Sequence, residues 1–148
     1  SFSSMVLGVL GVGYSLPRYI IGREEEIMFG LFGDKSEKEI KQLNKDAQVI
    51  IDHARQTFRA ELVRDIALQS GEHLGRARKV FEPNPIGLKR AIDDYKRLHQ
   101  EARRQRQDVL LSAFTLVLIY LRSEQQGEPC QPARDIIDDF IAEWAHTE

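Results

Sequence analysis

The chain has little cysteine and no excess of either charge. Its 148 residues include one cysteine, Cys130, which excludes an internal disulfide framework and is typical of a reducing compartment. It lies between Pro129 and Pro132, where we expect an incidental thiol in a loop. Lysine and arginine number 21 against 23 aspartate and glutamate, a net charge of −2. This balance excludes a global attraction to nucleic acid or to an anionic membrane, so any such binding would need a local patch.

The motifs of common enzyme and metal chemistry are also missing. The four histidines lack the spacing that places two ligands on one turn of a zinc helix. The single Glu143-x-x-His146 pair lacks the second copy and the further carboxylates that a di-iron bundle needs. No strand precedes the glycines at 8, 11 and 13, and Pro17 interrupts the helix that a dinucleotide-binding loop requires. We therefore expect no catalytic residue, no metal and no cofactor.

The most unusual segment present is an apolar leader, defined as residues 5–22. It carries one charge, Arg18, and is followed by Arg23 and by the acidic residues 24–26. Its glycines weaken a helix and Pro17 breaks one, so a membrane span is not favoured, although membrane contact stays an alternative. Such a segment would otherwise form a large exposed apolar patch, so we expect a docked arm. We divide the chain into an arm, 1–27, and a helical domain, 28–148, since Met28 could also start a compact protein.

A long amphipathic pattern follows the leader. Ser36 with Glu39 three residues later is the arrangement of a capping box, and it predicts a helix start. Apolar residues then recur at steps of three and four, which predicts one helix over 36–70 that is closed by Ser70-Gly71. A short helical turn is expected over 72–81, before the prolines at 83 and 85 break the chain.

The second half of the chain predicts three more helical segments. Helical spacing starts near Pro85 and continues until the run 109–121, which is apolar nearly all round. This run would rise only about 20 Å, short of a bilayer core of about 30 Å, so it predicts a helix buried within a bundle. A last amphipathic helix begins at Pro132. With no strand-like alternation, the sequence predicts an all-α fold, an irregular bundle of about four helices with an apolar, glycine-containing N-terminal arm.

One polar constellation could contact a partner. Lys96, His99, Arg103 and Arg106 step by three, four and three, which predicts a basic stripe along one helix face. Acidic residues near it cancel part of the charge, and no aromatic residues alternate with the cations to stack on bases. The stripe is therefore interpreted first as a solvated face, then as a contact for an acidic protein or lipid surface, and nucleic acid is the least favoured partner.

These patterns predict a non-enzymatic interaction or adaptor module. It would dock through its arm to itself, to a partner subunit or to a membrane-bound complex, in the cytoplasm or at a membrane. A helical nucleic-acid-binding or regulatory protein that uses residues 96–106 is the alternative, and an enzyme with an unrecognised helical site is a third. The expected partner contacts are the apolar anchors Val6, Leu7, Val9, Leu10, Leu16, Tyr19 and Ile20, with Lys96, Arg103 and Arg106 as a secondary polar surface.

Overall fold

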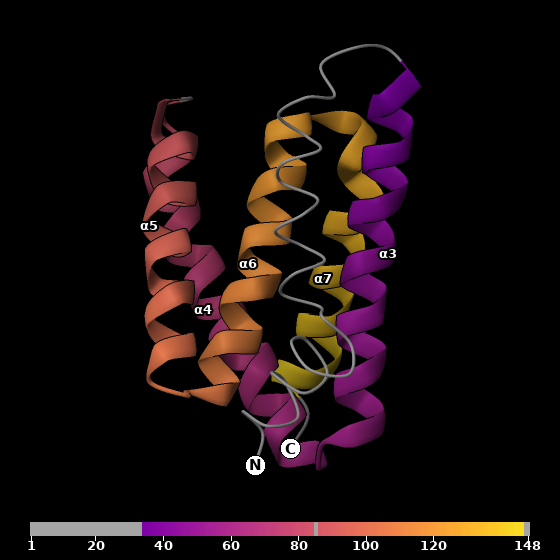
Figure 1. The fold of residues 1–148 in the computed structure, drawn as a ribbon, viewed down its shortest axis with the longest axis vertical. Helices are drawn as coiled ribbons and strands as arrows, with labels where there is room; N and C mark the ends of the chain where they lie inside the picture. The colour runs from indigo at the N-terminus through magenta and orange to yellow at the C-terminus, as the bar shows by residue number, and fades with distance from the viewer. Residues whose placement is uncertain (1–33, 85, 147–148) are drawn as a thin grey trace.

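The computed structural model describes residues 34–84 and 86–146, with side chains from residue 37 onward, and these residues form a bundle of five helices. Each helix runs antiparallel to the one before it (Figure 1). The described part of the chain contains no strand, so the all-α prediction is confirmed, with five helices in place of about four. The helices are α3 (Asp34–Thr57), α4 (Ala60–Phe81), α5 (Ile86–Arg104), α6 (Asp108–Gln126) and α7 (Gln131–Ala145), with a short 3₁₀ helix, η2 (Glu128–Cys130), before α7.

The predicted single helix over 36–70 is wrong, because the chain turns between α3 and α4. Thr57 donates its hydroxyl hydrogen bond to the carbonyl of His53, and Arg59 is extended, with φ −64° and ψ 152°. Neither glycine nor proline marks this turn, so the apolar periodicity runs through it unbroken. The helix also begins at Asp34, so Ser36 lies inside its first turn and is not the N-cap.

The predicted stop at Ser70-Gly71 is also wrong, since α4 continues through it to Phe81. Ser70 is fully buried, and a Cβ atom added at Gly71 would lie 3.2 Å from Cγ2 of Ile141 on α7. The glycine therefore serves the close packing of α4 on α7. The turn predicted over 72–81 is the second half of the same helix.

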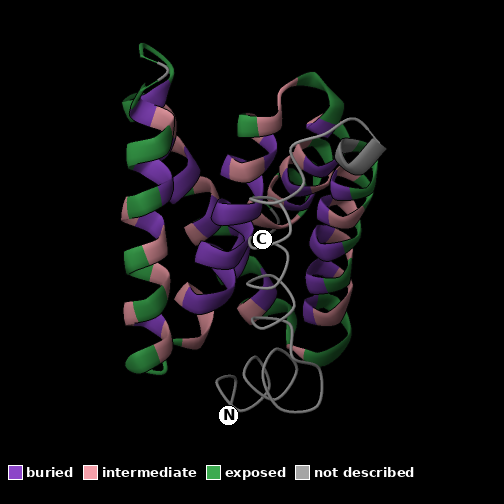
Figure 2. Cartoon of the chain, turned by 45° about the horizontal axis from the view of Figure 1, so that its top comes forward, coloured by how far each residue is buried: buried purple, intermediate pink, exposed green. Residues whose placement is uncertain are grey.

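Helix α6 is the centre of the bundle, as its apolar run predicts. Every residue from 111 to 121 is buried (Figure 2), and α6 packs against α3, α4, α5 and α7. The core therefore forms around one helix that is apolar on all sides. Among the helices of the described residues, none combines the length and the apolar character that a membrane crossing requires.

Two tight turns, one between α5 and α6 and one after α6, set the limits of α6. Before it, the N–H of Gln107 donates to the carbonyl of Ala102 at 2.9 Å and that of Arg106 to Arg103 at 3.2 Å, the paired bonds of a Schellman motif. Arg106 has a φ of 54°, the left-handed conformation in which glycine is usual. After α6, Gly127 has φ 85° and ψ −155°, a region essentially restricted to glycine.

Candidate functional site

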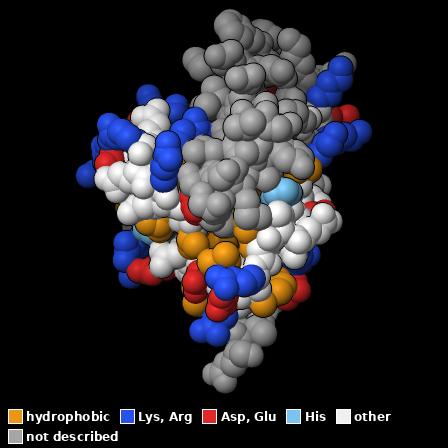
Figure 3. Space-filling model, turned by 60° about the horizontal axis from the view of Figure 1, so that its bottom comes forward, with side chains coloured by type: hydrophobic (Ala, Val, Ile, Leu, Met, Phe, Trp, Pro, Cys, Tyr) orange, Lys and Arg blue, Asp and Glu red, His pale blue; other side chains and the backbone are white. Residues whose placement is uncertain are grey.

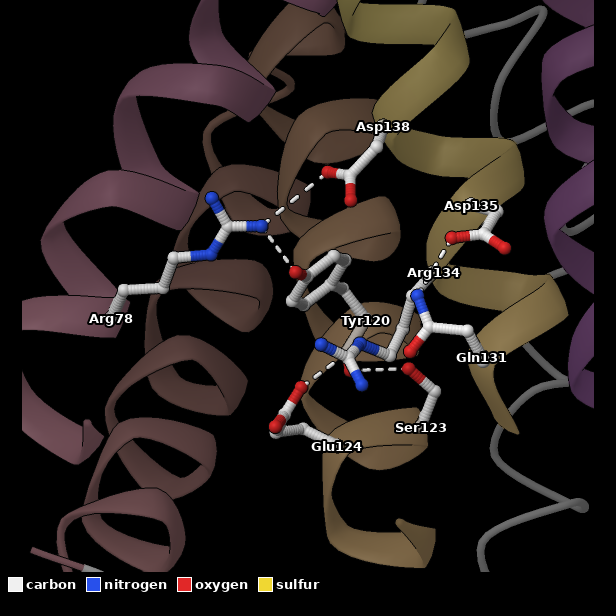
Figure 4. Close-up of polar contacts among 8 residues, drawn as sticks. All are labelled: Arg78, Tyr120, Ser123, Glu124, Gln131, Arg134, Asp135 and Asp138. Carbon is white, nitrogen blue, oxygen red and sulfur yellow. Dashed lines mark hydrogen bonds and ion pairs between the residues drawn. The ribbon is translucent and has the colours of Figure 1, made fainter. Parts of the chain in front are cut away.

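The most connected polar cluster of the described residues is the arginine–tyrosine cluster, defined as Arg78, Tyr120, Arg134, Glu124 and Asp138 (Figure 4). Tyr120 is on α6 and is 2% exposed. Its ring lies between two guanidinium groups, with Cζ of Arg78 on α4 at 4.9 Å and Cζ of Arg134 on α7 at 5.6 Å from the ring centroid. Cations at these distances are attracted to the aromatic face, so the cluster joins three helices through one ring.

Carboxylates complete the cluster. Arg78 donates to the hydroxyl of Tyr120 and contacts Asp138 at 3.4 Å, while Arg134 contacts Glu124 at 3.0 Å. Two cations and two carboxylates leave no net charge, so the cluster is not suited to capture an anion. These contacts connect α4, α6 and α7, so the arrangement fits a structural tie among the three helices.

The electrostatics of the cluster support the same interpretation. Burial alone would lower the pKa of Arg78, but its hydrogen bond to Tyr120 and the charge of Asp138 outweigh this effect and raise the pKa. Burial raises the pKa of Asp138, and Arg78 offsets part of that shift. Burial alone would lower the pKa of Arg134 as well, but Tyr120 and Glu124 outweigh this effect and raise it, so both arginines stay charged.

No pattern along the sequence predicts this role for these residues. A signal was available, because Tyr120 is the one residue of the run 109–121 that combines a large ring with a polar tip. Its partners lie 42 residues before it and 14 residues after it, so helical spacing could not connect them.

A second polar cluster lies between α4, α5 and α6. The hydroxyl of Tyr95 donates to the backbone carbonyl of His73 at 3.0 Å, so the ring nitrogen Nδ1 of His73, at 3.1 Å, donates to that hydroxyl. The ring of His73 meets that of Phe114 edge-on, with centroids 4.8 Å apart. Burial lowers the pKa of His73, with a further decrease from Arg76 that Glu72 partly opposes. The pair is a satisfied core contact.

His99 is the most perturbed histidine of the described residues. Thr115 donates to the carbonyl of Leu111 at 2.7 Å, so Nε2 of His99 donates to the Thr115 hydroxyl at 2.9 Å. Burial, followed by the charge of Arg103, lowers the pKa of His99 to about 4. The neutral imidazole is therefore an α5–α6 contact and is not a surface cation.

The stability of the bundle should decrease as the pH falls. The pKa of His99 is about 4 in the folded state and about 6.5 when unfolded, so between these values only the unfolded chain takes up the proton. We expect the free energy of unfolding to fall by about 2 kcal/mol from pH 7 to pH 4.5 through this group alone. The lowered pKa values of His53 and His73 act in the same direction.

Urea denaturation at the two pH values measures this effect. His99→Gln keeps a side-chain N–H donor for Thr115 but does not titrate, so it should lose most of that pH dependence. His146→Gln, at an exposed position after α7, is the matched control and should keep it. An equal pH dependence in the wild type and in His99→Gln would show that His99 is not the group responsible.

The predicted basic stripe is only partly assembled. Lys96, His99 and Arg103 are on α5, but Arg106 lies beyond its end, in the left-handed turn, so it does not continue the stripe. His99 points inward to Thr115, and Arg103 is half-buried, which lowers its pKa. Figure 3 shows basic and acidic side chains interspersed on the face that it presents. Whether Lys96, Arg103 or Arg106 contacts a partner stays a prediction.

The prolines that flank Cys130 predict a loop, but the structure places this residue in a short 3₁₀ helix. It is fully buried in η2. Burial raises the pKa of its thiol to about 11, Glu39 adds to the shift, and Arg134 partly opposes it. A thiol that stays protonated is a poor nucleophile, so the residue serves packing.

The remaining predictions concern the leader and a metal site. The seven apolar anchors of the leader and the proposed boundary at Met28 lie outside the described residues, so these predictions stay predictions. In residues 34–84 and 86–146, no group of three or more His, Cys, Asp or Glu side chains could hold a metal ion. Comparison of the chain with protein-family models, with curated proteins and with solved structures finds no match.

Proposed function

We propose that this protein is a non-enzymatic helical interaction module, which docks through residues 5–22 to a second copy of itself, to a partner subunit or to a membrane-bound complex. The observation that carries the proposal is the composition of the leader, which has one charge in eighteen residues beside a charge-dense helical domain. An apolar surface of that extent is typical of a segment that binds another surface.

The polar clusters of the bundle support this proposal indirectly. Arg78 and Arg134 contact Tyr120, and His99 donates to Thr115, so these polar groups of the described helices hold the fold together. The basic side chains of α5 would be a secondary contact for an acidic surface of the partner.

Light scattering with and without detergent tests the proposal. The full chain should associate, or change its state in detergent, because the leader is apolar. A chain lacking residues 1–27, and a full-length variant with Leu7→Asp and Leu10→Asp, should both be monomeric and indifferent to detergent. Ser3→Asp, which adds a charge outside the leader, is the matched control and should behave as the wild type. If the wild type itself is monomeric and indifferent to detergent, the proposal is wrong.

A further inference from the structure

One face of α6 has no helix of the described part of the chain packed along it. Around α6 the other helices follow in the order α5, α4, α7 and α3, and each packs against the next. α5 and α3 lie on opposite sides of α6 (Figures 1 and 2), and the described residues form no extended contact between them. The open face of α6 therefore lies between α3 and α5.

The residues of this face are known from the helix geometry. Leu111, Thr115 and Leu118 follow at steps of four and three, so they share a face of α6. They lie roughly opposite Tyr120, which points to α4 and α7. Thr115 borders α5 through its bond to His99. Leu111 and Leu118 are apolar, and no helix of the described residues packs along this face, so a segment that excludes water from it would stabilise the protein.

The two sides of this face carry opposite charges. On α3, Asp46 is nine residues before Arg55, about two and a half turns, so it lies on the opposite side from Arg55, which faces Glu143 and Phe140 of α7. Glu39 shares the side of Asp46, and the two are 4% and 1% exposed. On α5, Lys96 and Arg103 flank His99, which reaches α6. An acidic side and a basic side thus border an apolar floor.

The leader has the chemistry that fits this face of α6. Its apolar residues match the floor, and its one charge, Arg18, is opposite in sign to Glu39 and Asp46. The acidic residues 24–26 that follow it are opposite in sign to Lys96 and Arg103. Residues 23–33 could span about 35 Å when extended, enough to connect the leader to the start of α3 from either end of α6.

We propose that residues 5–22 of the same chain dock on the face of α6 that carries Leu111, Thr115 and Leu118, between α3 and α5. The inference rests on the proposed function, in which the leader is the docking arm, and it names the surface that holds the arm when no partner does. A short tether gives the arm an effective concentration of the order of mM, so its own bundle is the favoured site. A partner would have to displace it.

Paramagnetic broadening in the full chain tests this proposal. A spin label on Gln100→Cys of α5 or on Val49→Cys of α3 would be carried by a helix that borders this face, and both positions are exposed. The buried thiol of Cys130 should not react. Each label should cause a loss of amide signal intensity over residues 5–22. A label on Lys79→Cys, at an exposed position of α4, is the control and should leave those signals intact.

Two further samples separate the outcomes. Isotope-labelled protein mixed with spin-labelled, unlabelled protein should show no broadening, and broadening there would overturn docking within one chain. Arg18→Glu should reduce the effect of the label at position 49, whereas Arg18→Lys should keep it. No broadening from positions 49 and 100 would overturn the docking site. Docking within one chain would leave the wild type monomeric without detergent, so the proposed function is then judged by detergent, which should displace the arm and change the state of the wild type. A wild type that shows the broadening but is indifferent to detergent would contradict the proposed function and leave the docking site standing.

Discussion

Replacing Gly87 by alanine is expected to lower the free energy of unfolding by about 2–3 kcal/mol. Gly87 is buried at the second position of α5, where this helix starts against the end of α4. An added Cβ atom would lie 2.2 Å from the carbonyl oxygen of Val80 and 2.9 Å from Cα of Phe81. These are backbone atoms that cannot move aside as a side chain does, so α5 would have to shift away from α4.

Glycine-to-alanine substitutions at two positions of α4 make a matched series with Gly87→Ala, and urea denaturation would compare their free energies of unfolding. At Gly75 an added Cβ meets nothing within 4 Å, so Gly75→Ala should stabilise the protein by about 1 kcal/mol through helix propensity. At Gly71 an added Cβ would lie 3.2 Å from the side chain of Ile141. The stability gained from helix propensity and the stability lost to crowding should therefore nearly cancel. A stability of Gly87→Ala equal to or above that of the wild type would show that α4 and α5 do not approach as described.

The second large effect is expected for Tyr120→Ala, which should cost about 4 kcal/mol. The substitution removes a fully buried ring from the centre of the bundle and leaves a cavity between α4, α6 and α7. It also removes the aromatic face that both Arg78 and Arg134 contact. Thermal and urea unfolding followed by circular dichroism would measure the loss.

Tyr120→Phe is the control for this prediction, because it keeps the ring and removes only the hydroxyl. Arg78 would lose one acceptor but keep Asp138 and partial access to water, since its side chain is 36% exposed. We expect a cost of about 1 kcal/mol or less. A loss for the phenylalanine variant as large as for alanine would mean that the hydroxyl, and not the ring between two cations, holds the three helices together.

The sequence alone predicts the helices that are marked by a regular spacing of apolar residues. The apolar run 109–121 predicts the buried central helix that α6 is, and the stripe after Pro132 predicts α7, which begins one residue earlier. Both signals depend on the spacing of apolar residues along one helix, which the fold does not alter. The number of helices was underestimated, because the turn at 58–59 has no residue that breaks a helix.

The polar sites could be predicted less well, for a physical reason. Lys96, His99 and Arg103 were expected on one face of a helix, and they do share α5, but the sequence did not indicate that His99 points to Thr115. The arginine–tyrosine cluster joins residues from three helices, and no local spacing connects them. Burial and partners depend on which helices become neighbours.

By itself the sequence determined the helical character, the central apolar helix and the contrast between the leader and the charged domain, because these depend on residue types and their spacing. Only the tertiary structure decided where α3 turns into α4, that Gly71 and Gly87 serve close packing, and that Tyr120 lies between two arginines. These features arise from contacts between helices that are distant in the chain. Such contacts form only when the whole bundle closes around α6.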